Sequence, residues 1–278
     1  VQKFLDQKNS IELNNFANWI RISSNSDITN QELILLYNKY EKWPGINKLI
    51  LRLEKELSWQ ELNQDYYNFF IKNKPISLVG KIKISNYNKN NNDDEMIIKS
   101  WITGNFKKED ELFIYKKYSY LFNDKINIDR LNNMIWDKQW ININRQIKRV
   151  DKKYKLLADA KIKLSRRQYG VDNAVNKVPE ELKDNQGLIY ERVKWRRVSG
   201  LTDKSYELLY SFLSSHNEPL LKPKKWWNEI NWHTRNLFNK KKYIEAYNLL
   251  SHHKQIKISN VANAEWFLGW IALKFINK

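Results

Sequence analysis

The chain has 278 residues, which is enough for one large domain or two ordinary ones, and a hydrophobic content of 42% predicts a packed core. It contains no cysteine, so disulfides and thiolate metal sites are excluded. A net charge of +18 makes nucleic acid, anionic lipid and anionic cell-wall polymers candidate partners, although the abundance of Lys, Asn, Ile and Tyr is also typical of AT-rich coding sequences.

Apolar residues recur at helical spacing through the N-terminal half of the chain. The predicted helices cover residues 10–21, 31–40, 46–57, 60–71, 95–103 and 109–121, with a short one after 80. Trp43-Pro44-Gly45 interrupts this pattern, because proline disfavours helix in the residue before it. A second break is predicted from Pro75 to Gly80. Only seven glycines and five prolines are present, which favours helices with short loops over a β-fold.

The second half has the same periodicity. Further helices are predicted at 128–137, 139–149, 154–167, 188–198, after Thr202-Asp203, around 226–237, around 243–250 and at 259–278. His233 lies on an apolar stripe and is predicted to be a satisfied core residue. Helix pairs that recur about every 35 residues are typical of helical repeats. We therefore predict an all-α fold, a right-handed α-superhelix (solenoid) of stacked antiparallel pairs, forming one domain over residues 1–278 that need not be complete.

The last predicted helix carries the most distinctive pattern. Ser259 and Asn260 are expected to cap it. The run that follows is apolar almost all round, which predicts burial on most faces. A bulky ridge is formed by Trp266, Trp270 and Leu273. A row with almost no side chain is formed by Ala262, Gly269 and Ala272. A glycine inside a helix costs about 1 kcal/mol relative to alanine, so this row predicts close approach by a neighbouring helix.

Twelve tryptophans are many for a chain of this length. In an all-helical protein they usually fill wide gaps between helices, and that is the interpretation we favour. The alternative is an exposed platform on which sugars or bases stack.

Residues 138–167 concentrate positive charge. This window holds eleven Lys or Arg residues against two Asp, a net charge of +9. It is either a solvated helix face or an anion-binding surface. For the second case the predicted binding residues are Arg145, Lys148, Arg149, Lys152 and Lys153.

Catalytic signatures are missing from the sequence. There is no Gly-rich phosphate loop and no GxSxG or HExxH motif, and the four histidines have no metal-ligand spacing. No cofactor or metal is predicted. Glu191 and Glu265 lie among aromatic and apolar residues, where a carboxyl can act as a general acid. We expect each to pair with an arginine instead, and Arg192, Arg196 or Arg235 are available.

Several segments, in this order, are similar to one protein family. They are WPG at 43–45, Pro75 with Gly80, Trp101 with Gly104-Asn105-Phe106 and Glu109 to Glu111, Arg130-Leu131 with Met134-Ile135-Trp136 and Arg145, LADAKIKL at 157–164, VPEEL at 178–182, GLIYERVKWRRVSG at 187–200, Trp226-Trp227 with Glu229, YIEAYNLLSHH at 243–253, and AEWFLGWIALKF at 264–275. Together they resemble the N-terminal α-superhelical domain of the soluble lytic murein transglycosylases. The chain departs from this pattern at Ile230, where the family usually has an arginine.

The resemblance implies a ring-forming superhelix in the periplasm of a Gram-negative bacterium. In that family a separate lysozyme-like domain cleaves peptidoglycan between N-acetylmuramic acid and N-acetylglucosamine and forms a 1,6-anhydro product. Its catalytic glutamate-serine and GLMQ segments have no counterpart here, so no catalytic residue can be carried over. The resemblance thus implies a non-catalytic scaffold or fragment that shapes access of peptidoglycan strands in cell-wall turnover, with a partner supplying the catalytic domain.

Two other hypotheses remain. The chain could be a free-standing basic α-solenoid that binds protein or nucleic acid, or an inactive gene remnant. Against nucleic acid, the aromatic residues lie at core spacing and are not interleaved with the basic run. No membrane span, lipidation motif or signal peptide is evident, and the sequence begins with Val1.

Overall fold

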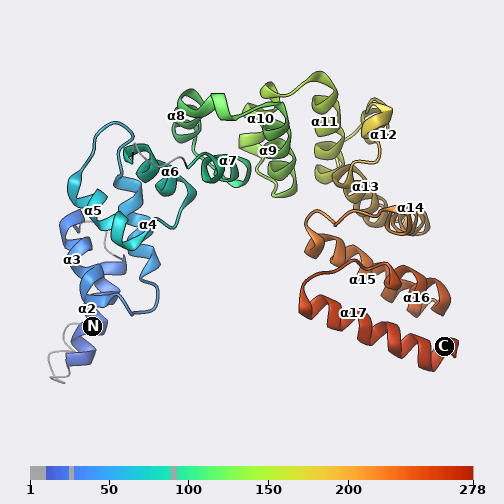
Figure 1. Cartoon of the computed structure of the whole chain (residues 1–278). Helices are drawn as coiled ribbons and strands as arrows, with labels where there is room; N and C mark the ends of the chain where they lie inside the picture. The colour runs from blue at the N-terminus through green and yellow to red at the C-terminus, as the bar shows by residue number, and fades with distance from the viewer. Residues whose placement is uncertain (1–10, 25–27, 89–92, 278) are drawn as a thin grey trace. The chain divides into compact units, whose positions relative to one another are not determined.

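The computed structural model describes residues 11–24, 28–88 and 93–277. Helices of all types account for 76% of these residues, and no strand occurs among them, which confirms the predicted all-α class. The chain divides into two compact units, residues 1–126 and 127–278, and each is described by itself (Figure 1). The arrangement of the helices into one superhelix over 1–278 stays a prediction.

The N-terminal unit consists of short helices of three to four turns. They are α2 (Ile11–Ser24), α3 (Asn30–Tyr40), α4 (Asn47–Glu56), α5 (Gln64–Asn73), α6 (Leu78–Tyr87), α7 (Asp94–Thr103) and α8 (Lys108–Tyr118), followed by the 3-10 turn η1 (Ser119–Leu121). Two hydrophobic clusters hold them together. One joins α2 to α6 around Leu33 and Leu53, and the other joins α6 to α8 around Trp101.

Local capping explains two differences from the predicted boundaries in this unit. Helix α5 starts at Gln64, four residues later than expected, because the Asn63 side chain accepts bonds from the backbone N–H groups of residues 65 and 66. Helix α6 starts at Leu78 because Ser77 caps it. Gly80 therefore lies inside a helix and not in the predicted break. In this helix a Cβ at position 80 would come within 2.7 Å of the Glu54 carboxyl carbon.

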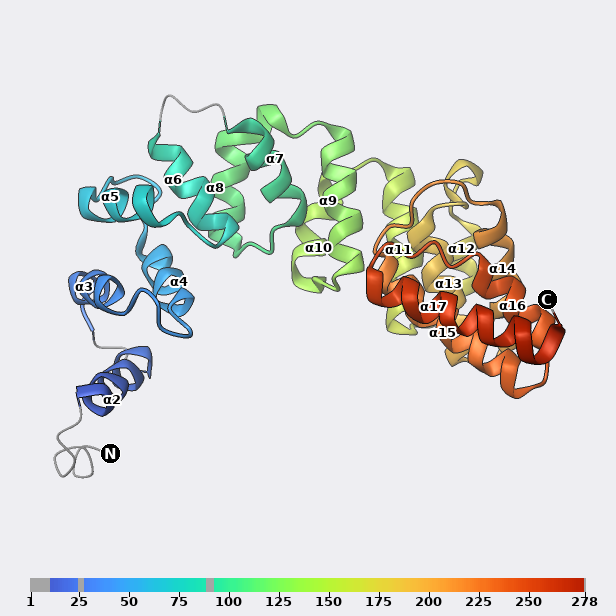
Figure 2. The same ribbon diagram turned by 60° about the horizontal axis from the view of Figure 1, so that its bottom comes forward.

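The C-terminal unit contains longer helices. They are α9 (Asp124–Trp136, which begins at the unit boundary), α10 (Trp140–Gln146), α11 (Lys152–Arg166), α12 (Val171–Asn176), α13 (Gln186–Val198), α14 (Thr202–Ser215), α15 (Pro223–Asn239), α16 (Tyr243–Ser251) and α17 (Ile258–Ile271). Short turns complete it, namely η2 (Ile147–Arg149), η3 (Glu180–Leu182) and η4 (Ala272–Ile276). Helices α13 and α14, α15 and α16, and α16 and α17 pack as sequence neighbours (Figure 2).

Lysine and arginine end several helices of this unit in a conformation that usually requires glycine. Lys138, Arg167 and Lys241 have positive φ, and the residue after each donates its N–H to a carbonyl one turn back, as in a Schellman motif. Gly200 has the same role after α13, where Leu201 N donates to Arg196 O at 2.8 Å. These residues account for sharp turns in a sequence with few glycines.

Most tryptophans are at least partly buried, as predicted. Four tryptophan side chains are buried and six are partly buried. Trp226 is fully buried, stacks on Phe212 with ring centroids 5.0 Å apart, and meets the edge of Tyr190 at 5.3 Å. The two exposed rings are Trp232 and Trp266, with 38% and 69% of their surface accessible.

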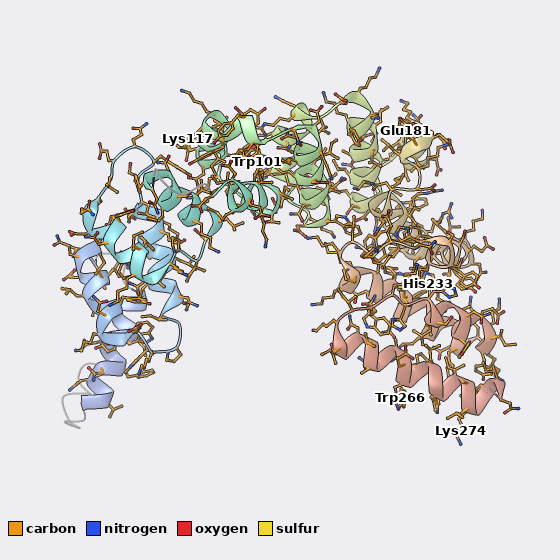
Figure 3. All side chains as sticks on the ribbon, viewed as in Figure 1. Trp101, Lys117, Glu181, His233, Trp266 and Lys274 are labelled. Carbon is orange, nitrogen blue, oxygen red and sulfur yellow. The ribbon has the colours of Figure 1, made fainter. Side chains whose placement is uncertain are left out.

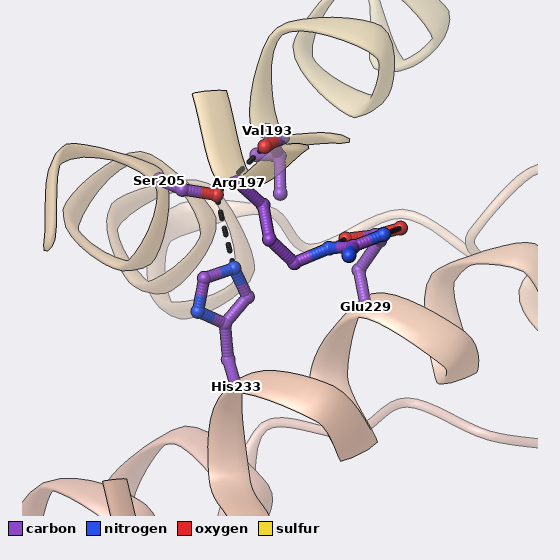
Figure 4. Close-up of polar contacts among 5 residues, drawn as sticks. All are labelled: Val193, Arg197, Ser205, Glu229 and His233. Atoms are coloured by element: carbon purple, nitrogen blue, oxygen red, sulfur yellow. Dashed lines mark hydrogen bonds and ion pairs between the residues drawn. The ribbon is translucent and has the colours of Figure 1, made fainter. Parts of the chain in front are cut away.

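A polar network connects α13, α14 and α15 inside the C-terminal unit (Figure 4). Arg197 donates through Nε and Nη2 to the two carboxylate oxygens of Glu229 at 2.6 and 3.0 Å. Glu229 is almost fully buried, so this bidentate pair compensates its charge, and it raises the pKa of Arg197. Glu229 thus receives its arginine from α13, while Ile230 packs in the core.

His233 is a buried core residue in this network, as predicted. Ser205 Oγ donates to Val193 O at 2.7 Å and lies 2.9 Å from His233 Nε2. Because that hydroxyl proton is used, Nε2 carries the imidazole proton and donates to Ser205. The Nδ1 atom of His233 is buried without a partner, so it can hold no second proton at low cost. Burial, and secondarily the charges of Arg197 and Lys240, lower the pKa of His233 to about 4.

We expect the free energy of unfolding to fall as the pH drops below 6.5. Below pH 6.5 the unfolded chain binds a proton on His233, whereas the folded chain accepts this proton only near pH 4. The stability that His233 contributes above pH 6.5 is therefore lost between pH 6.5 and about 4, and it changes no further at lower pH. The total loss from this residue is about 3 kcal/mol. Urea unfolding at several pH values would measure it. His233→Gln, which can still donate to Ser205, should have a smaller slope between pH 6.5 and 4, and equal slopes would contradict the assignment.

Helix α17 differs from its prediction in three ways. It begins at Ile258 after Lys257, without a side-chain cap, so Ser259 and Asn260 lie in its first turn and do not cap it. The predicted helix is not buried on most faces, because Trp266 of α17 and Leu273 of the turn η4 that follows it are 69% and 73% exposed. No helix among the described residues approaches Gly269 closely, and a Cβ added there would meet nothing within 4 Å. The face that packs into the core carries Ala264, Phe267 and Ile271.

Candidate functional site

The basic window folds into one local structure within the C-terminal unit. It covers α10, the turn η2 and helix α11, which share a small hydrophobic core around Ile143, Val150 and Ala158. This core covers one side of α11, a second cluster with α12 and α13 covers another through Leu157, Ala160 and Leu164, and the remaining face is left to solvent.

The five predicted binding residues occupy different surroundings. Arg145, which is itself on α10, donates to Asn142 Oδ1 at 2.6 Å, and Arg149 donates to Gln146 Oε1 at 3.1 Å. Both are half-buried and bonded to amide side chains of α10. Lys148, Lys152 and Lys153 are exposed, and Lys153 lies 3.7 Å from Glu181. The structure therefore does not gather the five into one surface: two are bonded to α10, and Lys153 is turned toward η3.

A cationic stripe runs along the exposed face of α11, and it includes residues that the sequence analysis did not single out. Lys152, Lys155, Lys163 and Arg166 recur at i, i+3, i+11 and i+14, which places them on one face of the helix. Asp159 lies on the same face and pairs with Lys163 at 2.9 Å. We call these four cations the α11 stripe. Helical spacing within the window was the signal that would have identified them.

An aromatic groove adjoins the C-terminal end of the α11 stripe. The guanidinium of Arg166 lies over the ring of Trp140, 5.7 Å from its centroid, which is cation–π geometry. The groove between α10 and α11 is lined by Trp140, Ile141, Ile143, Asn144, Ile162 and Arg166. Ile141 is 79% exposed, so part of this apolar surface is in contact with solvent. Positive charge and apolar surface are thus adjacent at this end of α11.

Lys161 contributes nothing to this surface, although it belongs to the basic window. Its side chain is buried between α9, α11 and α13, and Nζ donates to Asn132 Oδ1 at 2.9 Å. Burial lowers the pKa of Lys161 to about 8, against the opposing effect of Glu191. A Cβ at Gly187 would lie 2.7 Å from this Nζ, so a larger residue there would displace the lysine ammonium. Lys161 joins helices together and does not bind a ligand at the surface.

The carboxylates considered for catalysis lie in unsuitable places. Glu191 is buried, and burial raises the pKa of its carboxyl group, but it is closed off from solvent. The charges that lower the pKa of this carboxyl are the lysines at 194, 138 and 161, and no arginine among the described residues pairs with it, so the predicted arginine pair is wrong. Glu265 is exposed and pairs with His253 Nε2 at 3.0 Å, again not with arginine.

Neither the pair Ser205 and His233 nor a metal cluster provides a catalytic centre in the described residues. Ser205 and His233 are within hydrogen-bonding distance, but both are fully buried and no substrate can reach them. Within residues 11–24, 28–88 and 93–277, no cluster of His, Asp and Glu could hold a metal ion. None of the helices in that part of the chain is both long and apolar enough to cross a bilayer.

Comparison with known proteins adds no relative. No protein family, characterised protein or solved structure matches the chain.

Proposed function

We propose that the chain is a non-catalytic helical scaffold of the lytic murein transglycosylase type, which binds peptidoglycan strands in the periplasm. The order of its sequence segments supports the family. The observation that carries the binding function is the α11 stripe beside the groove at Trp140.

The chemistry of peptidoglycan suits this surface. The polymer carries carboxylates on its peptides and on the lactyl groups of muramic acid, and its sugar rings present apolar C–H faces. Lysine and arginine side chains would bind the carboxylates, while a tryptophan ring beside them would bind a sugar face. A strand that follows α11, about 22 Å long at 1.5 Å per residue, could contact all four cations.

Binding of this kind is a sum of small contributions. An exposed ion pair contributes about 0–1 kcal/mol, and salt screens it over about 8 Å at physiological ionic strength. We therefore expect weak binding, and the strand must be presented to a catalytic domain that is supplied separately.

A sacculus pull-down tests the proposal. A variant with glutamine at all four positions of the α11 stripe should bind about tenfold more weakly than wild type at low salt, and wild-type binding should fall at high salt. A variant with glutamine at Arg145, Lys148, Arg149, Lys152 and Lys153 should lose less, because Arg145 and Arg149 are already bonded to α10.

The matched control removes the same charge elsewhere. Lys107, Lys108, Lys116 and Lys117 are exposed on α8 and at its start, and their replacement by glutamine should leave binding close to wild type. Equal binding by the stripe variant and wild type would reduce the stripe to a solvated helix face. If duplex DNA displaces sacculi at matched charge, a nucleic-acid ligand is the better hypothesis.

A further inference from the structure

One face of α17 is apolar and exposed, and the exposed Lys274 of η4 adjoins its C-terminal end. Ala262, Trp266 and Gly269 lie on this face, and Leu273 follows in the π-helical turn η4 that continues the helix. Figure 3 shows Trp266 on the side of the helix that points away from α15 and α16. The opposite face is packed into the core of the C-terminal unit. Helix α17 therefore has two apolar faces, of which the described part of the chain covers one.

The exposed residues follow the spacing of a coiled-coil seam. Ala262, Trp266 and Gly269 are separated by four and three positions, so they alternate between two seam positions of a heptad, and Leu273 follows four positions later in η4. Bulky and small residues alternate along it, in the order alanine, tryptophan, glycine, leucine. The notch at Gly269 is open, since an added Cβ would meet nothing within 4 Å.

This order is self-complementary in an antiparallel pair. If a two-fold axis passes between residues 267 and 268, Trp266 faces the partner's Gly269, and Leu273 faces the partner's Ala262. Each large side chain then meets a position with little or no side chain, and the symmetry repeats the contact in both directions. The small residues Ala262 and Gly269, which the sequence analysis placed in one row, are thus matched in shape by another copy of the same helix.

Charge favours a second copy over other occupants. No lysine or arginine occurs from Ser259 to Leu273, although the chain has a net charge of +18. The single ionisable side chain there, Glu265, is paired with His253. Two copies of a strongly basic chain repel least through such a face. An acidic protein or an anionic membrane would instead be expected to contact lysine and arginine.

We propose that the exposed face of α17 forms an antiparallel homodimer. The helix has 14 residues and is about 21 Å long, so the interface is smaller than the about 1,200–2,000 Å² of stable complexes. The dimer is therefore weak and depends on concentration. Added salt strengthens it, because screening reduces repulsion between the two basic chains while the apolar contact remains. This salt dependence is opposite in sign to that expected for peptidoglycan binding.

Sedimentation velocity over micromolar to near-millimolar concentrations, at low and high salt, tests the proposal. Wild type should shift from monomer to dimer, and more so at high salt. Gly269→Leu fills the notch and should weaken association by about tenfold, equivalent to about 1.4 kcal/mol. The same change removes a glycine from a helix and meets open space in the monomer, so the thermal stability of the dilute protein should not fall.

Two further variants test the register. Trp266→Ala should weaken association, whereas Tyr169→Ala, which removes an aromatic side chain that is fully exposed outside α17, should not. The double variant with Trp266→Gly and Gly269→Trp exchanges the large and small positions. It should associate more strongly than a variant with either change alone.

Three results would overturn the proposal. One is a wild-type monomer at every concentration and salt level. Another is dimerisation of folded Gly269→Leu with wild-type affinity. The third is a wild type that stays monomeric but binds anionic vesicles in a flotation assay, with binding abolished by Trp266→Ala. That result would assign the face to a lipid surface.

Discussion

Replacing Arg197 by alanine is expected to lower the free energy of unfolding by about 3–5 kcal/mol, because it leaves a buried carboxylate without its partner. Glu229 is only 2% exposed, and both of its oxygens accept bonds from this one guanidinium at 2.6 and 3.0 Å. The adjacent Arg196 is the matched control. It donates to Lys204 O at the surface, so Arg196→Ala should cost less than about 1 kcal/mol.

Urea unfolding followed by circular dichroism measures both variants. A second test uses Glu229→Gln, which removes the charge but keeps the shape and leaves Arg197 partly exposed to water. It should cost less than Arg197→Ala, since water can solvate the arginine. If Arg197→Ala and Arg196→Ala have the same stability, the buried pair does not hold α13 to α15.

Removing the indole of Trp101 is expected to destabilise the N-terminal unit by about 3–5 kcal/mol, the usual cost of truncating a large buried aromatic residue to alanine. Trp101 is fully buried. Its ring stacks on Phe122 with centroids 4.5 Å apart and planes at 6°, and on Phe106 at 6.2 Å. Trp101→Ala would leave a cavity between α7 and the chain on either side of α8.

Hydrogen exchange locates this effect as well as measuring it. Because the two units are compact by themselves, amides of α6 to α8 should lose protection in Trp101→Ala, while those of α13 to α16 keep it. Leu112→Ala is the control within the same unit, since that side chain is 50% exposed on α8 and its loss should cost less than about 1 kcal/mol. Equal loss of protection in both units would contradict the separation.

The sequence predicted most helices correctly but not the shortest ones. Helix α12, with six residues, and the turn η3 were missed because neither completes two turns of apolar periodicity. Boundaries failed where side chains cap a helix. Asn63 and Ser77 satisfy backbone N–H groups and start α5 and α6, whereas Ser259 has the right side chain but makes no such bond.

The sequence predicted the charged segment of the candidate site but not which of its residues lie together on one surface. Lys161 and Lys163 are two residues apart and look alike in sequence, yet one is buried against Asn132 and the other pairs with Asp159 near solvent. Residues two positions apart on a helix are rotated by about 200° relative to each other, so their side chains lie on opposite faces. Only the packing of α9 and α13 decides which of these faces is covered.

The sequence by itself determined the all-α class, most helix positions, the core role of His233 and the concentration of positive charge in 138–167. Those features depend on local periodicity and composition, which neighbours in the chain fix. Tertiary structure decided which cations lie on the stripe, that Glu229 receives its arginine from α13, and that α17 leaves Trp266 and Gly269 exposed. These outcomes depend on contacts between residues far apart in sequence, and an apolar helix face has the same pattern whether another helix covers it or not.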